Sequence, residues 1–328
     1  MSDLGEDGAD VVVLREDMHG TPIGVYANAL RERLPDFEIA HARTPEEERE
    51  LVGNTPIATG VRFEERLLED TGALRLFACA AAGVGHLPIE SLAEGDVAVT
   101  NASGVHGPNM AEYALGAILH FVRGFGEART RKERHEWRHF QARELTGSTV
   151  TVVGLGAIGE AIVDRLESFD VETIGMRYSP EKGGPTDEVC GFGEAEFHDA
   201  LARTEYLVLA TPLTDTTEGL LGSEEFVTLP PEAIVTNVGR GPLIDTDSLV
   251  SALQRNQIDG AALDVTDPEP LPQDHALWHM DNVLLTPHNA GHTPEYYHRL
   301  ADIVAGNVKQ ITETGSYEDL DNQVQQIK

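Results

Sequence analysis

The chain has 328 residues, of which 41% are hydrophobic and 24% are charged, and it carries a formal net charge of −32. This length suits about two domains with cores of ordinary size, and such an acidic chain is a poor partner for nucleic acid or an anionic membrane. The sequence has no apolar run long enough to span a bilayer, begins with an acidic segment in place of a signal peptide, and contains only two cysteines, Cys79 and Cys190, without metal-ligand spacing. We therefore expect a cytoplasmic globular protein without a bound metal.

Acidic residues are spread along the whole chain, whereas lysine occurs only at Lys132, Lys182, Lys309 and Lys328. One interpretation is a binding surface for a basic partner. The other is the solvated surface of a protein adapted to molar salt, where the Debye length is about 3 Å and like charges are screened. We favour the second because the acids do not gather in one tail, and we expect a halophilic protein that is destabilised in dilute buffer.

The first part of the chain contains short apolar segments with the length of strands, separated by helical patterns, at residues 10–14, 55–59, 74–79 and 96–100. Strands that alternate with helices predict a parallel α/β sheet. The first hundred residues therefore predict a small α/β domain. A loop at 101–109 and a strongly apolar helix at 110–122 mark the crossing into a second domain.

Two polar segments are expected to lie in solvent. Residues 123–143, which include Trp137, are rich in basic residues and are the local exception to the acidic charge. A solvated helix is the favoured interpretation of this connector, rather than a ligand site. The C-terminal tail from Gly315 onward is polar, and we expect it to be frayed.

Residues 148–160, S-T-V-T-V-V-G-L-G-A-I-G-E, combine a strand, a glycine turn and the start of a helix. Glycines at this spacing allow a tight turn, close approach of the backbone to a pyrophosphate and close packing of helix on sheet, while the helix N-terminus attracts the anion. A glycine-rich turn that only redirects the chain is the alternative. We predict a dinucleotide site with contacts from Gly154, Gly156, Ala157, Ile158 and Gly159.

Further apolar strands are predicted in the second half of the chain, at residues 171–176, 206–210, 233–237, 260–265 and 283–286. Glycine and polar residues follow these strands. In open parallel α/β sheets, ligands bind beyond the carboxyl ends of the strands. We therefore expect additional cofactor contacts from residues near these ends: Thr211, Pro212, Thr217, Val238, Gly239, Asp264 and Gly291.

The second predicted strand of this domain ends in Arg177, followed by Tyr178 and Ser179. Sites selective for NAD place an acidic residue here, which bonds the ribose 2′-hydroxyl. An arginine attracts the 2′-phosphate of NADP instead, while Ser179 can add a hydrogen bond and Tyr178 can cover the adenine. The alternative is an ordinary arginine at a strand end. We predict that NADP(H) is preferred and that NAD(H) can still bind.

Three residues with complementary chemistry follow three successive strands: Arg240, Glu269 and His288. Each has an ordinary alternative, as a surface ion pair, one acid among many, or one of 13 histidines. An arginine can bind a carboxylate through two parallel hydrogen bonds, and a histidine oriented by a carboxylate can transfer a proton near neutral pH. Their shared location at the ligand-binding edge predicts that they act together in catalysis.

Several motifs in register resemble the D-isomer-specific 2-hydroxyacid dehydrogenase family, and the resemblance covers nearly the whole chain. It is densest in T-N-V-G-R-G-P-L-I-D-T-D-S-L-V-S-A-L (236–253), G-A-A-L-D-V-T-D-P-E-P-L-P (260–272), H-A-L-W (275–278) and N-V-L-L-T-P-H-N-A-G (282–291). The resemblance implies that Arg240, Glu269 and His288 form the catalytic set, with His288 as the acid and base.

The resemblance also implies contacts between the substrate carboxylate and the backbone amides of Ala82, Gly83 and Val84. Gly85 departs from the family pattern, in which aspartate is commoner, and this changes the expected rigidity of the loop. The implied reaction is reversible hydride transfer between NAD(P)H and a small 2-ketoacid. A dinucleotide-sensing protein, similar to the corepressors among the relatives, is the alternative, and the intact catalytic set argues against it.

The fold implied by the resemblance is α/β, with two Rossmann-like or flavodoxin-like parallel-sheet domains. A cofactor domain at residues 103–294 is inserted into a substrate domain made of 1–102 and 295–328. Family members are usually homodimers, so we expect a homodimer.

Overall fold

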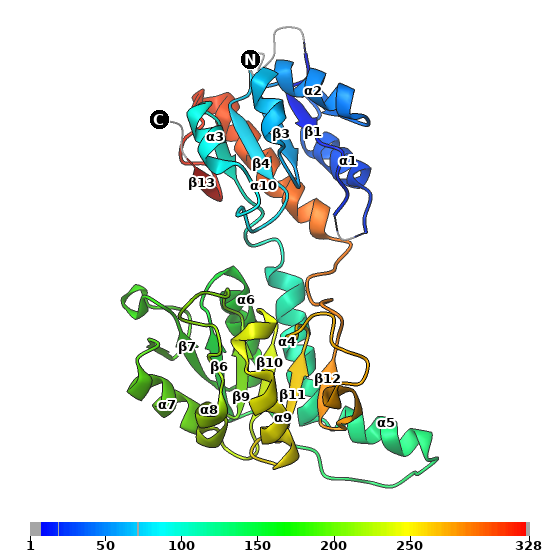
Figure 1. Ribbon diagram of the computed structural model, residues 1–328, viewed down its shortest axis with the longest axis vertical. Helices are drawn as coiled ribbons and strands as arrows, with labels where there is room; N and C mark the ends of the chain where they lie inside the picture. Colours follow the sequence, from blue (N-terminus) through cyan, green and yellow to red (C-terminus); the bar gives the residue numbers. More distant parts are fainter. Residues whose placement is uncertain (1–7, 19, 71, 326–328) are drawn as a thin grey trace. The chain divides into compact units, whose positions relative to one another are not determined.

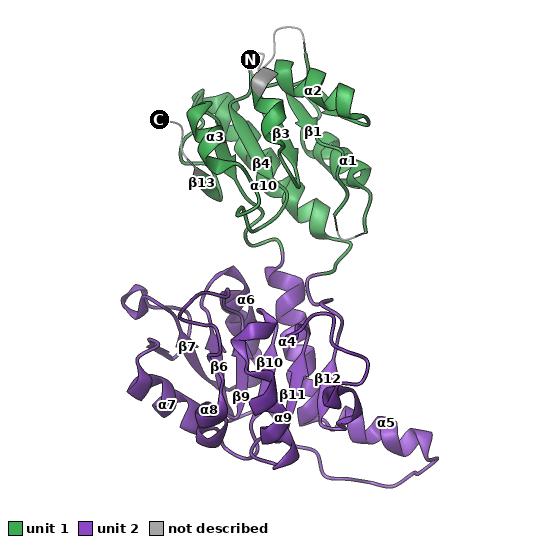
Figure 2. Cartoon of the chain, viewed as in Figure 1, with its two compact units in different colours: residues 1–105, 292–328 green, residues 106–291 purple. Residues whose placement is uncertain are grey.

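The structure is a computed structural model that describes residues 8–18, 20–70 and 72–325. The chain divides into two compact units, which Figure 2 distinguishes by colour. Unit 1 comprises Met1–Val105 and His292–Lys328, and unit 2 comprises His106–Gly291. Unit 2 is therefore an insertion in the sequence of unit 1. No helix in the described ranges is long and apolar enough to cross a membrane.

Unit 1 contains a six-stranded sheet in the order β13-β5-β4-β3-β1-β2, in which only β13 is antiparallel to its neighbour (Figure 1). The five parallel strands follow the flavodoxin-like order. The strands are β1 (Val11–Val13), β2 (Ile39–His41), β3 (Ile57–Gly60), β4 (Leu76–Cys79), β5 (Ala98–Thr100) and β13 (Gln323–Gln325). The helices are α1 (Ile23–Arg33), α2 (Pro45–Asn54), α3 (Ile89–Glu94) and α10 (Tyr296–Thr314), with a 3-10 turn, η1 (Glu65–Asp70).

The core of unit 1 lies on both faces of its sheet. One apolar cluster joins β-strand side chains to α1 and α10, and a second joins the other face to residues of α2, η1 and α3. Strands that are buried on both faces require continuous apolar sequence, as in β1, whose three valines are fully buried. Because α10 packs on one face of this sheet, a helix near the C-terminal end of the chain forms part of the unit 1 core.

The expectation of a frayed C-terminal tail is wrong for its described part. After α10 ends at Thr314, the chain returns as β13 and pairs with β5, with Gln323 opposite Thr100. Strand pairing uses backbone N–H and C=O groups, which every sequence supplies. The polar side chains of the tail therefore gave no sign that it forms a strand. The tail thereby covers an edge of the unit 1 sheet.

Unit 2 contains seven parallel strands in the order β12-β11-β10-β9-β6-β7-β8. They are β6 (Thr149–Val153), β7 (Glu172–Met176), β8 (Glu188–Cys190), β9 (Tyr206–Leu209), β10 (Ile234–Asn237), β11 (Gly260–Leu263) and β12 (Val283–Leu285). Chain order reverses on either side of β6, because β7 lies on one side of it and β9 on the other. In a doubly wound sheet, this switch point opens the crevice in which ligands bind.

Helices cover both faces of the unit 2 sheet. A ligand can therefore approach the sheet at the edge formed by the carboxyl ends of its strands. On one face α4 (Gly107–Val122) packs with α6 (Ala157–Leu166), and on the other lie α7 (Glu194–Arg203), α8 (Ser223–Thr228) and α9 (Thr246–Gln254). A further helix, α5 (Phe125–Glu133), contributes no buried residue. The predicted α/β fold with two parallel-sheet domains is confirmed.

Candidate functional site

The glycine turn between β6 and α6 has the geometry of a phosphate site. Gly154 has a φ of +100°, and a Cβ there would lie 2.7 Å from the carbonyl oxygen of Ala210. A Cβ at Gly159 would overlap the carbonyl oxygen of Gly154, so this glycine permits close helix packing. Around Gly156, by contrast, no protein atom lies within 4 Å of an added Cβ. Gly156 and Ala157 are exposed, while Ile158 is half-buried, at the start of α6, and the free N–H groups of a helix start can bind an anion.

The loops after β9 and β10 are fixed by their own polar side chains. The hydroxyl of the buried Thr217 donates to the carbonyl oxygen of Pro212 at 2.7 Å and thereby closes the loop that begins at Thr211. After β10, the side chain of Asn237 accepts from the Gly239 amide and donates to the Arg240 carbonyl oxygen. Asn237 and Val238 are buried, so the turn before Arg240 is held from inside the sheet.

Asp264, at the end of β11, anchors the loop that carries His288. Its buried carboxylate accepts hydrogen bonds from the Thr286 hydroxyl at 2.6 Å and from the amides of Asn289 and Ala290 at 2.8 and 2.9 Å. The hydroxyl of Tyr113 on α4 bonds Thr286 in turn. Both carboxylate oxygens are therefore engaged in orienting the 286–290 loop.

His288 and Glu269 form the hydrogen-bonded pair that the catalytic proposal requires. The distance between His288 Nδ1 and Glu269 Oε1 is 2.7 Å, and both side chains are about half exposed. His288 has a φ of +52°, a left-handed conformation that costs about 1–2 kcal/mol for a non-glycine residue. Bonds from its amide to the carbonyl oxygens of Asp264 and Thr286 hold this conformation. The pair leaves Nε2 as the imidazole nitrogen for a reacting group.

Arg240 lies on the neighbouring strand end and is exposed. Its Nη1 donates to the Gly239 carbonyl oxygen at 2.7 Å. The strands β10, β11 and β12, which precede Arg240, Glu269 and His288, are adjacent and parallel. The fold therefore brings these three residues to adjacent positions on one edge of the unit 2 sheet.

Comparison with known proteins identifies the family. A family model described as D-isomer specific 2-hydroxyacid dehydrogenase, NAD binding domain, matches residues 115–290, more than half of the chain. The chain belongs to this family. The predicted family is confirmed. The matches do not favour the corepressor-like alternative.

Relatives and solved structures of the 2-hydroxyacid dehydrogenases extend the match over more of the chain. A glyoxylate reductase of Thermofilum pendens is 34% identical over 75% of this chain and 74% of that protein. A D-3-phosphoglycerate dehydrogenase of Methanocaldococcus jannaschii is 31% identical over 88% of this chain, which spans only 56% of that protein. A D-isomer specific 2-hydroxyacid dehydrogenase of Xanthobacter autotrophicus, solved with NADPH and MES, is 27% identical with a TM-score of 0.76, over 97% of this chain and 98% of that chain.

Arg177 follows β7, and its Nη1 donates to the Gly183 carbonyl oxygen at 2.6 Å. This bond ties the strand end to the loop that contains the 3-10 turn η3 (Pro180–Lys182). Ser179 precedes the turn, and the Tyr178 side chain is 81% exposed. All three residues lie where a dinucleotide ribose binds in folds of this order. Gly291, after β12, packs against the His106 ring at the other end of the edge.

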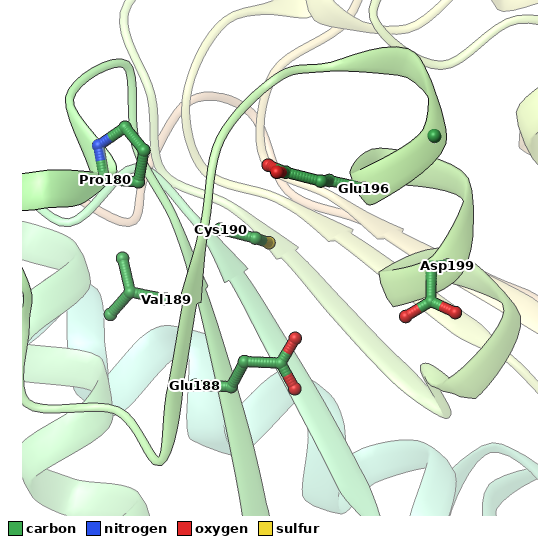
Figure 3. A pocket seen from close by; sticks show the side chains of 7 residues that line it. Pro180, Glu188, Val189, Cys190, Glu196 and Asp199 are labelled. Carbon is green, nitrogen blue, oxygen red and sulfur yellow. The ribbon is translucent and has the colours of Figure 1, made fainter.

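A cavity of about 410 Å³ lies beside this region, between β8 and α7 (Figure 3). Its carboxylates already have partners: Glu188 and Asp199 pair with Arg203, and Glu196 accepts from the Gly191 amide. Burial raises the pKa of the Cys190 thiol to about 11, so the thiol stays protonated and is a poor nucleophile. This cavity adjoins β8, at the opposite end of the sheet from β12, and we assign it no chemistry. No group of three or more His, Cys, Asp and Glu within the described ranges is arranged to hold a metal.

The predicted substrate loop, Ala82-Gly83-Val84, lies in unit 1 after β4. Ala82 and Gly83 are exposed, and Asn101 donates to the Ala82 carbonyl oxygen at 2.8 Å. The sequence interpretation missed the residues that support the site, namely Asn237, Thr286 and Tyr113. A polar residue at the last position of a buried strand, as Asn237 is in β10, is the signal that could have identified one of them.

Proposed function

We propose that the protein catalyses the reversible reduction of a small 2-ketoacid to a D-2-hydroxyacid with a nicotinamide cofactor. The observation that carries the proposal is the 2.7 Å hydrogen bond between His288 and Glu269, on the sheet edge that also carries Arg240. The names of relatives, glyoxylate reductase and glyoxylate/hydroxypyruvate reductase, suggest glyoxylate or hydroxypyruvate as substrates.

The glycine turn fits the pyrophosphate of the cofactor, since open space surrounds Gly156 at the N-terminus of α6. Further contacts are assigned to the strand-end residues Thr211, Pro212, Thr217, Val238, Gly239, Asp264 and Gly291. A reduced nicotinamide, when bound, supplies the hydride for the C2 atom of the substrate. We assign cofactor binding to residues 103–294 and substrate binding to 1–102 with 295–328, where the amides of residues 82–84 bind the substrate carboxylate.

Each catalytic residue has a separate task in the proposal. Arg240 binds the substrate carboxylate and polarises the ketone through its guanidinium. Protonated His288 donates from Nε2 to the carbonyl oxygen as negative charge develops there, and takes the proton back in the oxidation. Glu269 accepts from Nδ1, which orients the ring and stabilises the imidazolium.

The test is NADPH oxidation at 340 nm in molar KCl with glyoxylate, hydroxypyruvate, pyruvate and 2-ketoisocaproate. We expect turnover with at least one of them. A folded protein that binds NADPH and oxidises it with none of these acids would support the dinucleotide-sensing alternative.

We further propose a preference for NADP(H) over NAD(H). Arg177 supplies a cation at the position where NAD-selective sites carry an acid, and its bond to the Gly183 carbonyl oxygen holds the guanidinium at the strand end. Replacing Arg177 by Asp should shift the ratio of kcat/KM values toward NADH. An unchanged ratio would remove Arg177 from the site.

A homodimer is proposed through the arm, defined as residues 123–143. The arm carries seven basic and three acidic residues in a chain of net charge −32, and it extends away from the sheet of unit 2 (Figure 1). Trp137 is fully exposed and Phe125 is 56% exposed, so apolar and basic groups together face solvent. An acidic second copy of the chain is complementary to this surface. Sedimentation should give a dimer for the wild type and for Val227→Ser, another exposed apolar site, and a monomer for Trp137→Ser.

The charge of the remaining surface supports adaptation to a salt-rich cytoplasm. Screening of like charges at molar salt should stabilise the fold. The melting temperature is therefore expected to rise between dilute buffer and molar KCl, and a flat response would contradict this proposal.

A further inference from the structure

The loop that carries Glu269 rests directly on the segment that carries Arg240. A Cβ added at Gly241, the residue after Arg240, would overlap the carbonyl group of Thr266 and lie 2.7 Å from the Asp267 amide nitrogen. Gly241 is buried and starts the 3-10 turn η4 (Gly241–Leu243). The absence of a side chain at position 241 thus allows backbone-to-backbone contact between two loops that end different strands.

A hydroxyl on the same segment makes a second link to the Glu269 loop. Thr246, the first residue of α9, donates from Oγ1 to the Asp267 carbonyl oxygen at 2.9 Å, across 21 residues of sequence. The start of α9 is itself fixed, because Asp245 caps the helix through the Ser248 amide and Leu249 is buried in the core. The hydroxyl therefore belongs to a rigid element, and the carbonyl group that it bonds lies two residues before Glu269.

We infer that Thr246 is a positioning residue for the catalytic pair. The hydroxyl fixes Asp267, the Asp267 backbone fixes the place of Glu269, and Glu269 orients His288 through the 2.7 Å hydrogen bond. Thr246 acts only through this loop, and the inference rests on the proposed function of Arg240, Glu269 and His288. The link makes the placement of the proton donor depend on the segment that binds the substrate carboxylate.

The first experiment compares Thr246→Val, which keeps the shape but lacks the hydroxyl, with Thr246→Ser, which restores it. Thr312→Val on α10 is the matched control, because it removes a hydroxyl-to-carbonyl bond of 2.8 Å in unit 1. For Thr246→Val we expect kcat to fall roughly threefold to tenfold, the range that one hydrogen bond supplies. The KM for the ketoacid and the Kd for NADPH should not change, and Thr246→Ser should recover wild-type kcat.

The pH profile separates positioning from general destabilisation. In Thr246→Val the alkaline limb of ketoacid reduction should move to lower pH, because a displaced carboxylate stabilises the imidazolium less. The charged groups on the neighbouring strand-end segments include Arg240, Asp245, Asp247, Asp264, Asp267 and Glu269, and the substitution leaves all of them in place. In a Glu269→Gln background, Thr246→Val should change kcat less than twofold, since the two residues act in series.

A crystal structure of Thr246→Val tests the link without turnover, so its result is independent of whether the proposed reaction is correct. We expect Glu269 Oε1 to lie beyond hydrogen-bonding distance of His288 Nδ1. An unchanged pair, or a loss of kcat that Thr312→Val reproduces and that leaves the pH profile unmoved, would overturn the inference.

Discussion

Unit 1 and unit 2 both end their parallel strands in loops of small and polar residues, but they hold these loops differently. In unit 2, Asn237 and Asp264 at the ends of β10 and β11 bond the backbone of the site loops. In unit 1, Asn101 after β5 donates to the Ala82 carbonyl oxygen, and tyrosine hydroxyls from α10 bond two further segments: Tyr296 donates to the Ala80 carbonyl oxygen, and Tyr297 accepts from the Met18 amide. Side chains at its own strand ends therefore support the proposed catalytic edge, whereas the segment before the predicted substrate loop is also bonded by a helix more than 200 residues later in the chain.

The two arrangements also differ in the chemistry of their supporting groups. Burial raises the pKa of Tyr296 and raises the pKa of Tyr297 to about 12, so both remain neutral across the physiological range. In unit 2 the corresponding acceptor is the carboxylate of Asp264, which binds more donors than one hydroxyl can. Substitutions of the strand-end residues in unit 2 should thus lower kcat or the free energy of unfolding strongly. Substitutions near residues 82–84 in unit 1 should mainly raise the KM for the ketoacid.

The largest expected effect is on turnover. Replacing His288 by Gln should lower kcat about 10²–10⁴-fold, the range for loss of a positioned proton donor, while the Kd for NADPH stays the same. Gly83→Ala in unit 1 is the counterpart, because an added Cβ there meets no protein atom within 4 Å and the loop can still fold. It should raise the KM for the ketoacid and leave the chemical step intact. Wild-type turnover in a folded His288→Gln protein would contradict the assignment.

The next effect concerns stability. Replacing Asp264 by Ala removes three hydrogen bonds and leaves the Ala290 amide, a buried donor, without an acceptor. This should cost about 3 kcal/mol or more of unfolding free energy. Asp264→Asn, which retains one acceptor oxygen, should cost less. Urea unfolding measures both, and equal loss in the two variants would show that the carboxylate is not the anchor.

A smaller effect is expected at the tyrosine support of unit 1. Replacing Tyr296 by Phe removes the bond to the Ala80 carbonyl oxygen and should cost about 1 kcal/mol of stability. Because Ala80 precedes the substrate loop, the KM for the ketoacid should also rise. Tyr206→Phe, at the amino end of β9, is the control, and its KM should match that of the wild type. An increase in KM in both variants would contradict a specific effect of the Tyr296 hydroxyl on the predicted substrate loop.

The smallest expected effect is on the pH dependence of the unfolding free energy, and it concerns two helix caps. The α2 cap in unit 1 is the neutral Thr44, and the α9 cap in unit 2 is Asp245, whose pKa is lowered by its hydrogen bonds from Ser248. A lowered pKa means that the cap stabilises the fold above the ordinary aspartate range, near pH 4, and that this stabilisation is lost as pH falls further. Each cap should contribute about 1 kcal/mol at pH 7. Unfolding of Thr44→Ala and Asp245→Ala from pH 7 to 3 should show a pH-dependent difference from wild type only for Asp245.

Local pattern was sufficient to predict the class of fold, and it also predicts a dinucleotide turn and a catalytic set of three residues. Buried parallel strands need continuous apolar sequence, and a phosphate turn needs glycine at fixed spacing, so both appear in short windows. The same reasoning identified Arg240, Glu269 and His288 as residues of adjacent strand ends, because the carboxyl ends of parallel strands share one edge.

Only the tertiary structure decided which groups hold these residues in place. The bond from Thr246 to Asp267, the anchoring of the 286–290 loop by Asp264 and the return of β13 to β5 all join segments that are distant in sequence. Apart from the bond between the Thr286 and Asp264 side chains, these contacts use backbone carbonyl or amide groups, which nearly every residue supplies and which therefore leave no mark on the sequence pattern. The proposed chemistry can be inferred from residue types in the sequence. The contacts that hold the proposed site residues in position depend on how the chain folds in three dimensions.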